Sequence, residues 1–316
     1  VRKRRGIGDH TAPGSRDTYR MLRITPHLWF DKEAVEATEF YAAAFPDGKV
    51  TNVSTIKDTP SGDCDIVSFE LLGQPFQAIS AGPFFQFTPA ISFLVRCATP
   101  DQVDALWSQL SEGGSPLMPL DSYPFSDRYG WIADSYGLSW QVMLDVRGEI
   151  GQAIVPSLMF VGDVCGKAEE AATHYASVFP ESRADHVQRY GEGEEPDLSG
   201  TVRHLYLDLG GYKLAAMDSA HDHDFGFNEA ISFMVGCETQ DEIDHYWDKL
   251  TAVPEAEQCG WLKDRFGVSW QIVPTALDEF LSTGTQEQVD RVTQAFLQMK
   301  KFDIAELERA YEGTGR

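Results

Sequence analysis

Apolar residues recur along the chain with two periods, one typical of strands and one typical of helices. Runs rich in Val, Ile, Phe and Leu predict strands at residues 24–30, 50–56, 64–72, 74–80 and 90–97. Apolar side chains at helical spacing predict helices near residues 31–45 and over 99–110, the second with a Thr-Pro-Asp start signal. Residues 130–133 and 138–144 predict a closing hairpin.

This pattern occurs twice. The matching segments are ITPHLWF (24–30) with IVPSLMF (154–160), AISFLVRC (90–97) with AISFMVGC (230–237), and GWIADSYGLSWQV (130–142) with GWLKDRFGVSWQI (260–272). About ten extra residues fall in a loop at 191–200 of the second half, and the first half has the longer loop, at 113–129. The chain is therefore a tandem duplication.

Length and charge restrict the partners. The 316 residues suffice for about two domains of ~150 residues each. The net charge is −23, from 26 Lys and Arg against 49 Asp and Glu, and it repels nucleic acid and anionic lipid. We therefore expect no nucleic acid and no membrane partner. Since no apolar run nears the ~20 residues of a membrane span and the five cysteines lack Cys-x-x-Cys spacing, we expect a cytoplasmic protein.

The two ends of the chain differ from the repeats. Residues 1–21 are basic and lack an apolar core, so we expect a disordered leader; an arm for an anionic partner is the alternative. Residues 276–316 predict three helices, at 276–282, 286–300 and 303–311. We expect this helical extension to pack against the two repeats, and binding of a partner is the alternative.

Both halves resemble a known family. The segments TPHLWF, FYAAAFPD, GQPF, FTPAISFLV and GW(I/L)xDxxGxSWQ are similar to the PhnB-like branch of the vicinal oxygen chelate superfamily, the glyoxalase, bleomycin resistance and dioxygenase superfamily. The resemblance covers residues 22–145 and 153–275, with 146–152 as a linker. This branch often bears a ubiquinone-methyltransferase name, but no strand is followed by Gly-x-Gly-x-x-Gly, so we do not expect methyl transfer.

The resemblance implies an α+β fold of tandem glyoxalase-like domains. Each domain is built of paired βαβββ modules whose mixed sheet forms a cup, and the two halves form an internal pseudo-dimer. Whether modules exchange between the halves, and whether the chain forms larger oligomers, stays open.

The alternation of strand side chains indicates which residues line the cup. The resemblance places the superfamily's metal-ligand positions at His27, Ser92 and Gln141 in the first half and at Ser157, Ser232 and Gln271 in the second. With exchanged modules the composite set would be His27, Gln141 and Ser232. A hydroxyl and a carboxamide are weak ligands, so we expect no tightly bound catalytic metal; a divalent metal at His27, Ser92 and Gln141 is the alternative.

The first cup is the expected working site. His27 is the candidate for handling a proton, and Gln141 for polarising a substrate oxygen. Structural roles, as a satisfied strand histidine and a sheet-capping amide, are the alternatives. The candidate substrate contacts are Trp29, Ser92, Leu94, Met143, Phe85 and Phe87. Ser157 and Met159 replace His27 and Trp29, which makes the second cup less titratable.

Together these features predict a PhnB-like protein that binds a small, partly apolar oxygenated molecule in the first cup. A metal-dependent lyase, isomerase or dioxygenase-type enzyme is the alternative, and the sequence leaves open whether any reaction is catalysed. The His221-Asp222-His223-Asp224 stretch predicts an exposed loop rather than a metal site. Asp134 and Asp264 lie in Asp-x-x-Gly turns, which predicts bonds from the turn backbone to their carboxylates.

Overall fold

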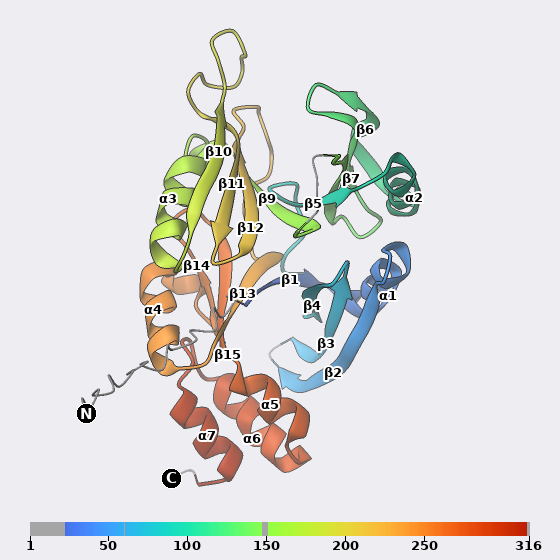
Figure 1. The fold of residues 1–316 in the computed structure, drawn as a ribbon. Helices are drawn as coiled ribbons and strands as arrows, with labels where there is room; N and C mark the ends of the chain where they lie inside the picture. The colour runs from blue at the N-terminus through green and yellow to red at the C-terminus, as the bar shows by residue number, and fades with distance from the viewer. Residues whose placement is uncertain (1–22, 60, 147–150, 315–316) are drawn as a thin grey trace, which may run out of the picture.

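The computed structural model describes residues 23–59, 61–146 and 151–314 (Figure 1). The predicted leader at 1–21 and most of the predicted linker lie outside the described residues. None of the described helices is long and apolar enough to cross a membrane.

Each half contains two modules. Those of the first half are β1 (Ile24–Phe30), α1 (Ala34–Ala44), β2 (Lys49–Thr59), β3 (Gly62–Leu71), β4 (Gln74–Ser80), then β5 (Ile91–Cys97), α2 (Pro100–Leu110), β6 (Ser115–Tyr123), β7 (Ser126–Ala133), β8 (Ser139–Leu144). Those of the second half are β9 (Ile154–Phe160), η1 (Gly162–Val164), α3 (Ala168–Val178), β10 (Arg183–Arg189), β11 (Val202–Leu209), β12 (Tyr212–Asp218), then β13 (Ile231–Cys237), α4 (Gln240–Leu250), η2 (Pro254–Ala256), β14 (Trp261–Lys263), β15 (Ser269–Pro274). Three further helices follow: α5 (Ala276–Thr283), α6 (Gln286–Phe296) and α7 (Ile304–Glu312).

The modules pair across the two halves. Over the described residues, sheet A has seven strands in the order β14-β15-β13-β1-β4-β3-β2, and sheet B has eight in the order β10-β11-β12-β9-β5-β8-β7-β6. Antiparallel pairing of β1 with β13, and of β5 with β9, joins a module of one half to a module of the other. The predicted α+β fold with two cup-like mixed sheets is confirmed, and the exchange that the sequence left open takes place.

The two modules of one half meet through their helices. In Figure 1, α1 and α2 lie on one side of the strands and α3 and α4 on the other. The buried Asp134 carboxylate accepts hydrogen bonds from the Tyr41 hydroxyl of α1 (2.8 Å) and the Trp140 indole of β8 (2.9 Å). It also accepts the backbone N–H groups of Tyr136 and Leu138, as the turn motif predicts. Asp264 repeats these bonds with the Tyr175 hydroxyl and the Trp270 indole in the second half.

The prediction of a loop at residues 113–129 is wrong. It forms β6 and the start of β7, an antiparallel hairpin whose register shifts several times. In the second half no strand of the described residues takes the place of β6. Instead, the N–H groups of Cys259 and Gly260 donate to the carbonyls of Met299 and Lys300, which follow α6. The C-terminal helices are thereby held against the second half, with Phe302 and Leu307 in the main core.

The close approach of Phe302 to Gly260 yields a stability prediction. A Cβ on Gly260 would lie 2.5 Å from the Phe302 ring and 2.9 Å from the Ile272 carbonyl oxygen, at a φ of +84°. Gly137 has the same φ of +84°, but a Cβ there would meet nothing within 4 Å. We expect Gly137→Ala to cost about 1 kcal/mol and Gly260→Ala about 2 kcal/mol more, measured by urea unfolding. Equal losses would show that the contact with Phe302 yields without cost.

Candidate functional site

The face of sheet A opposite the helices gathers polar side chains from both halves. His27 of β1 lies opposite Ser232 of β13, and Ser232 lies beside Ser269 of β15. Trp261 of β14 lies opposite Gln271 of β15. We call the surface formed by His27, Trp29, Ser232, Trp261, Ser269 and Gln271 the His27 face. The other side of these strands contributes Leu28, Phe30, Phe233 and Trp270 to the main core.

The remaining predicted residues lie on sheet B. Ser92 lies opposite Ser157, and Leu94 beside Gln141. Leu94 and Met143 belong to a separate buried cluster with Tyr129, Val155 and Ala215.

The expected grouping of His27 with Ser92 and Gln141 is therefore not assembled, because β5 and β8 are strands of the other sheet. The alternative set of His27, Gln141 and Ser232 is assembled only in part. Gln271 stands where Gln141 was expected, since β15 borders β13.

On sheet B the polar groups of the matching face bond one another, although the buried Tyr212 hydroxyl of β12 in the same sheet has no partner among the described residues. The Tyr129 hydroxyl donates to Gln141 Oε1 at 2.8 Å, and Gln141 Nε2 donates to Ser92 Oγ at 2.7 Å. The Trp131 indole donates to Ser139 Oγ at 2.7 Å. Both ends of the Gln141 carboxamide are thus engaged within the protein.

The corresponding groups on sheet A are not all satisfied. Gln271 Nε2 donates to Ser232 Oγ at 2.8 Å, but Cys259 stands where the first half has Tyr129. Trp261 Nε1 and Ser269 Oγ, the counterparts of the bonded pair Trp131 and Ser139, are both buried and have no hydrogen-bond partner among the described residues. A buried polar atom without a partner costs about 1–3 kcal/mol, so both atoms can still take a hydrogen-bonding partner such as water or a ligand.

His27 lies beside Trp261, and Ser232 separates it from Ser269. Its side chain is buried, with 2% exposure, and its ring meets the Trp261 ring edge-on at 5.6 Å between centroids. Burial lowers the pKa of His27 to about 3, because the charged imidazolium would lose its hydration. The imidazole is therefore neutral at physiological pH, with one nitrogen as donor and the other as acceptor.

Aromatic rings flank one end of the His27 face. The Trp29 indole donates to the Gly82 carbonyl at 2.8 Å, which fixes the following loop, and its ring meets Phe85 at 5.1 Å and Phe84 at 6.4 Å. Phe84 is 66% exposed. Phe87, predicted as a substrate contact, instead meets Phe30 at 5.0 Å and packs against the main core.

Comparison with known proteins agrees with this architecture. Residues 22–143 and again residues 152–273 match the family model described as 3-demethylubiquinone-9 3-methyltransferase. The chain belongs to this PhnB-like family. It is thereby a tandem member of the vicinal oxygen chelate superfamily, as the resemblance implied.

Two solved structures illustrate the relationship. A PhnB protein from Bacillus cereus, described as a 3-demethylubiquinone-9 3-methyltransferase, is 36% identical over 38% of this chain and 98% of its own, with a TM-score of 0.36. Glyoxalase I from Zea mays is 9% identical over 80% of this chain and 93% of its own, with a TM-score of 0.51, a likeness of fold. No curated protein matches the chain.

The family suggests two groups that this PhnB-like chain does not fit. A divalent metal normally has at least three strong donors, and the set of His27, Ser232 and Gln271 offers one imidazole beside a hydroxyl and a carboxamide already bonded to each other. For a methyl donor, no described connection from a strand to an α-helix contains Gly-x-Gly-x-x-Gly. The donor chemistry therefore disfavours a tightly bound metal at this face.

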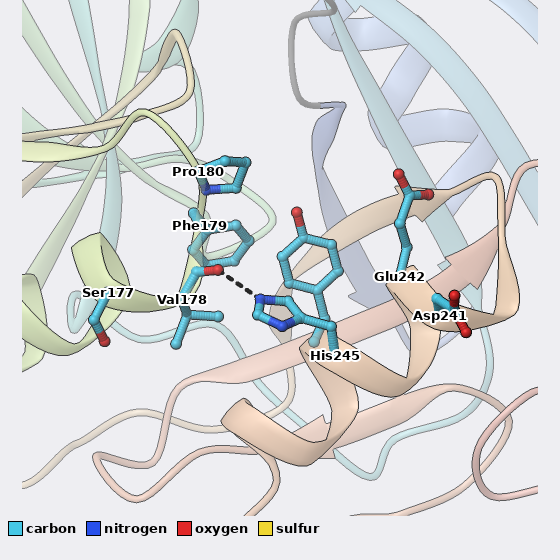
Figure 2. A pocket seen from close by; sticks show the side chains of 8 residues that line it. Ser177, Val178, Phe179, Pro180, Asp241, Glu242 and His245 are labelled. Carbon is cyan, nitrogen blue, oxygen red and sulfur yellow. Dashed lines mark hydrogen bonds between the residues drawn. The ribbon is translucent and has the colours of Figure 1, made fainter.

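The hollow between α3 and α4 and the stretch 221–224 are weaker candidates for a functional site. A surface hollow of about 480 Å³ lies between the end of α3 and α4, where His245 Nε2 hydrogen-bonds the Val178 carbonyl at 2.9 Å. Figure 2 shows the side chains that line it. Its Glu242 caps α4 by accepting the Thr239 N–H, so the polar groups serve the helices. In the stretch 221–224, His221 is exposed and His223 bonds Ser219, as expected of a surface loop.

The sequence predicted His27, Ser232 and Gln271 as candidate site residues but did not indicate Trp261 and Ser269. A signal was present, because the second half keeps the Trp and Ser of the repeated motif while Cys259 replaces Tyr129. That exchange does not by itself reveal an unmade bond, since Trp261 and Ser269 are the same residue types as the bonded pair.

The two serines allow a direct test of the unmade bond. Ser139→Ala removes the acceptor of the Trp131 indole, and we expect it to lower the free energy of unfolding by about 1–2 kcal/mol. Ser269→Ala removes a hydroxyl without a partner, and we expect no loss or a gain of up to about 1 kcal/mol in the ligand-free protein. Urea unfolding measures both, and equal losses would contradict the asymmetry.

The depressed pKa of His27 predicts acid sensitivity. Below the unfolded pKa of about 6.5 the unfolded chain binds a proton that the folded chain excludes, so unfolding becomes easier as the pH falls. Between about pH 6 and pH 4 we expect wild type to lose about 1.4 kcal/mol per pH unit relative to His27→Gln. Urea unfolding of both proteins over this range measures the difference. Parallel curves would mean that His27 is protonated in the folded protein.

Proposed function

We propose that the His27 face of sheet A binds a small, partly apolar oxygenated molecule without a tightly bound metal. The observation that carries this proposal is the pair of buried atoms without partners, Trp261 Nε1 and Ser269 Oγ, whose counterparts in sheet B bond each other. An oxygen of the ligand would accept the Trp261 N–H, and the Ser269 hydroxyl could donate to it or accept from it.

The low pKa of His27 favours binding over proton transfer. An imidazole whose conjugate acid has a pKa of about 3 is a weak base at neutral pH. Its neutral ring suits a hydrogen bond to an uncharged ligand.

We propose that this binding takes place in the cytoplasm, because all five cysteines are free rather than paired.

The aromatic end of the His27 face is less covered than the matching end of sheet B. Trp29 and Met234 are only partly buried, whereas their sheet B counterparts Met159 and Leu94 are buried. Trp261 and its counterpart Trp131 are both partly buried. The β6 hairpin, whose Met118 and Tyr123 pack against the buried cluster of sheet B, has no equivalent strand among the described residues of sheet A. Among the described residues, sheet A therefore lacks the hairpin side chains that pack over the corresponding side of sheet B.

The duplicated tryptophans test the proposal by binding. We expect small ketones, alcohols and carboxylic acids, screened as a panel against the ¹⁵N-labelled full chain, to include molecules that shift the indole N–H signal of Trp261 and leave that of Trp131 in place. Trp261→Phe should weaken binding of such a molecule at least tenfold by calorimetry, since the donor is lost, while Trp131→Phe should change it less than twofold.

Each alternative outcome has a distinct reading. Shifts at Trp131 alone would move the binding site to sheet B and overturn the proposal. If no member of the panel shifts Trp261, the two atoms are served by water, and the proposal fails. Melting temperatures of both variants, which lose the same part of an indole ring, control for changes in folding.

A further inference from the structure

Lys263 and Glu229 form an ion pair at the edge of the His27 face. Lys263 of β14 lies opposite Ser269 and so shares its side of the sheet. Its Nζ lies 2.6 Å from a carboxylate oxygen of Glu229, and the two side chains are only 22% and 21% exposed. Glu229 precedes Ala230, whose carbonyl accepts the backbone N–H of Trp29. The ion pair therefore stands beside the aromatic end of the face.

This ion pair is peculiar to sheet A. In the first half, Ala133 and Pro89 take the places of Lys263 and Glu229, so sheet B carries no charge at this position. A half-buried pair with a short contact is more costly to break than an exposed one, because each charge would lose its partner in a poorly hydrated place. A ligand carboxylate would have to displace Glu229 from Lys263, and a ligand ammonium would have to displace Lys263 from Glu229.

The interior of the face offers hydrogen bonds but no net charge. Trp261 Nε1 can only donate, so the group that meets it must be an acceptor. Ser269 and His27 are neutral and can each donate or accept. No cation among these residues is free to balance an anion, because Lys263 is already paired with Glu229.

Aromatic side chains set the shape of the remaining surface. Trp29 meets Phe85, Phe84 and Trp261 edge-on, at interplanar angles of 82°, 75° and 74°. Edge-to-face packing of this kind extends favourably to a further ring, which gains about 0.5–1.5 kcal/mol beyond its buried area. A planar aromatic ligand would continue the cluster.

We propose, on the basis of the function proposed above, that the ligand is an uncharged aromatic molecule whose carbonyl or hydroxyl oxygen accepts the Trp261 N–H. The Lys263–Glu229 pair is the specificity-determining element that excludes charged analogues of the same size. Glu229 is thus a positioning residue, because it acts by holding Lys263.

A set of benzene derivatives of similar size tests the ligand class. The probes are acetophenone, benzoate, benzylammonium and ethylbenzene, titrated into the ¹⁵N-labelled full chain while the Trp261 indole signal is followed. That signal is assigned by its loss in Trp261→Phe. We expect acetophenone to bind at least tenfold more tightly than benzoate and benzylammonium. Ethylbenzene, which has no acceptor, should not shift the Trp261 N–H downfield.

Glu229→Gln tests the role of the ion pair. It leaves Lys263 without its counter-charge, so we expect benzoate affinity to rise at least fivefold and acetophenone affinity to stay within twofold. Glu112→Gln removes the same charge from the exposed turn that follows α2 and should change neither affinity. Melting temperatures show whether both variants fold like wild type.

The outcomes separate this inference from the proposed function. Tighter binding of benzoate or benzylammonium than of acetophenone in wild type would overturn the ligand class while the site stands. Unchanged benzoate affinity in Glu229→Gln would overturn the role of the pair. If no probe of this set shifts Trp261 but a non-aromatic ketone or alcohol does, the aromatic assignment is wrong. If neither set shifts it, the proposed function itself fails.

Discussion

The antiparallel pairing of β1 with β13 and of β5 with β9 is the interaction on which the rest of the structure depends. Each of these strands opens a module, and each would present unpaired N–H and C=O groups at a sheet edge if the other half were missing. Because pairing runs between the halves, the His27 face draws His27 from the first half and Ser232, Trp261 and Ser269 from the second. Neither half can build this surface alone.

The duplication has diverged at the two polar networks. In sheet B, Tyr129 completes the bonds of Gln141, and the β6 hairpin covers the neighbouring strand. In sheet A, Cys259 replaces that tyrosine, and the carbonyls of Met299 and Lys300 accept the backbone N–H groups of Cys259 and Gly260. Two orphaned polar atoms oppose folding, and sites that break a rule of local consistency in this way are often functional ones. The asymmetry thus argues for different roles of the two sheets.

The sequence predicted most helices and strands because their signals are local. Thr99 caps α2 and Thr239 caps α4, each with the reciprocal bond of a capping box. The hairpin at β6 could not be predicted, because Pro116, Pro119 and Asp121 interrupt any alternation of apolar residues. The exchange of modules could not be predicted, since the AISF sequence opens both β5 and β13 and suits pairing within a half as well as between halves. His27 was recognised as the titratable member of its strand, but its neighbours depend on that topology.

The buried carboxylates explain how exchange coexists with intact halves. Asp134 links α1 to β8 by hydrogen bonds, and Asp264 links α3 to β15. The two modules of each half are therefore held together on the helix-covered side of the sheets. Burial raises the pKa of both groups, and the hydrogen bonds to Tyr, Trp and the turn backbone oppose that shift. The sheets, in contrast, continue from one half into the other. A ligand bound against His27 of β1 and Trp261 of β14 would therefore contact both halves, and its binding energy would add to the stability of the assembled pair rather than of either half.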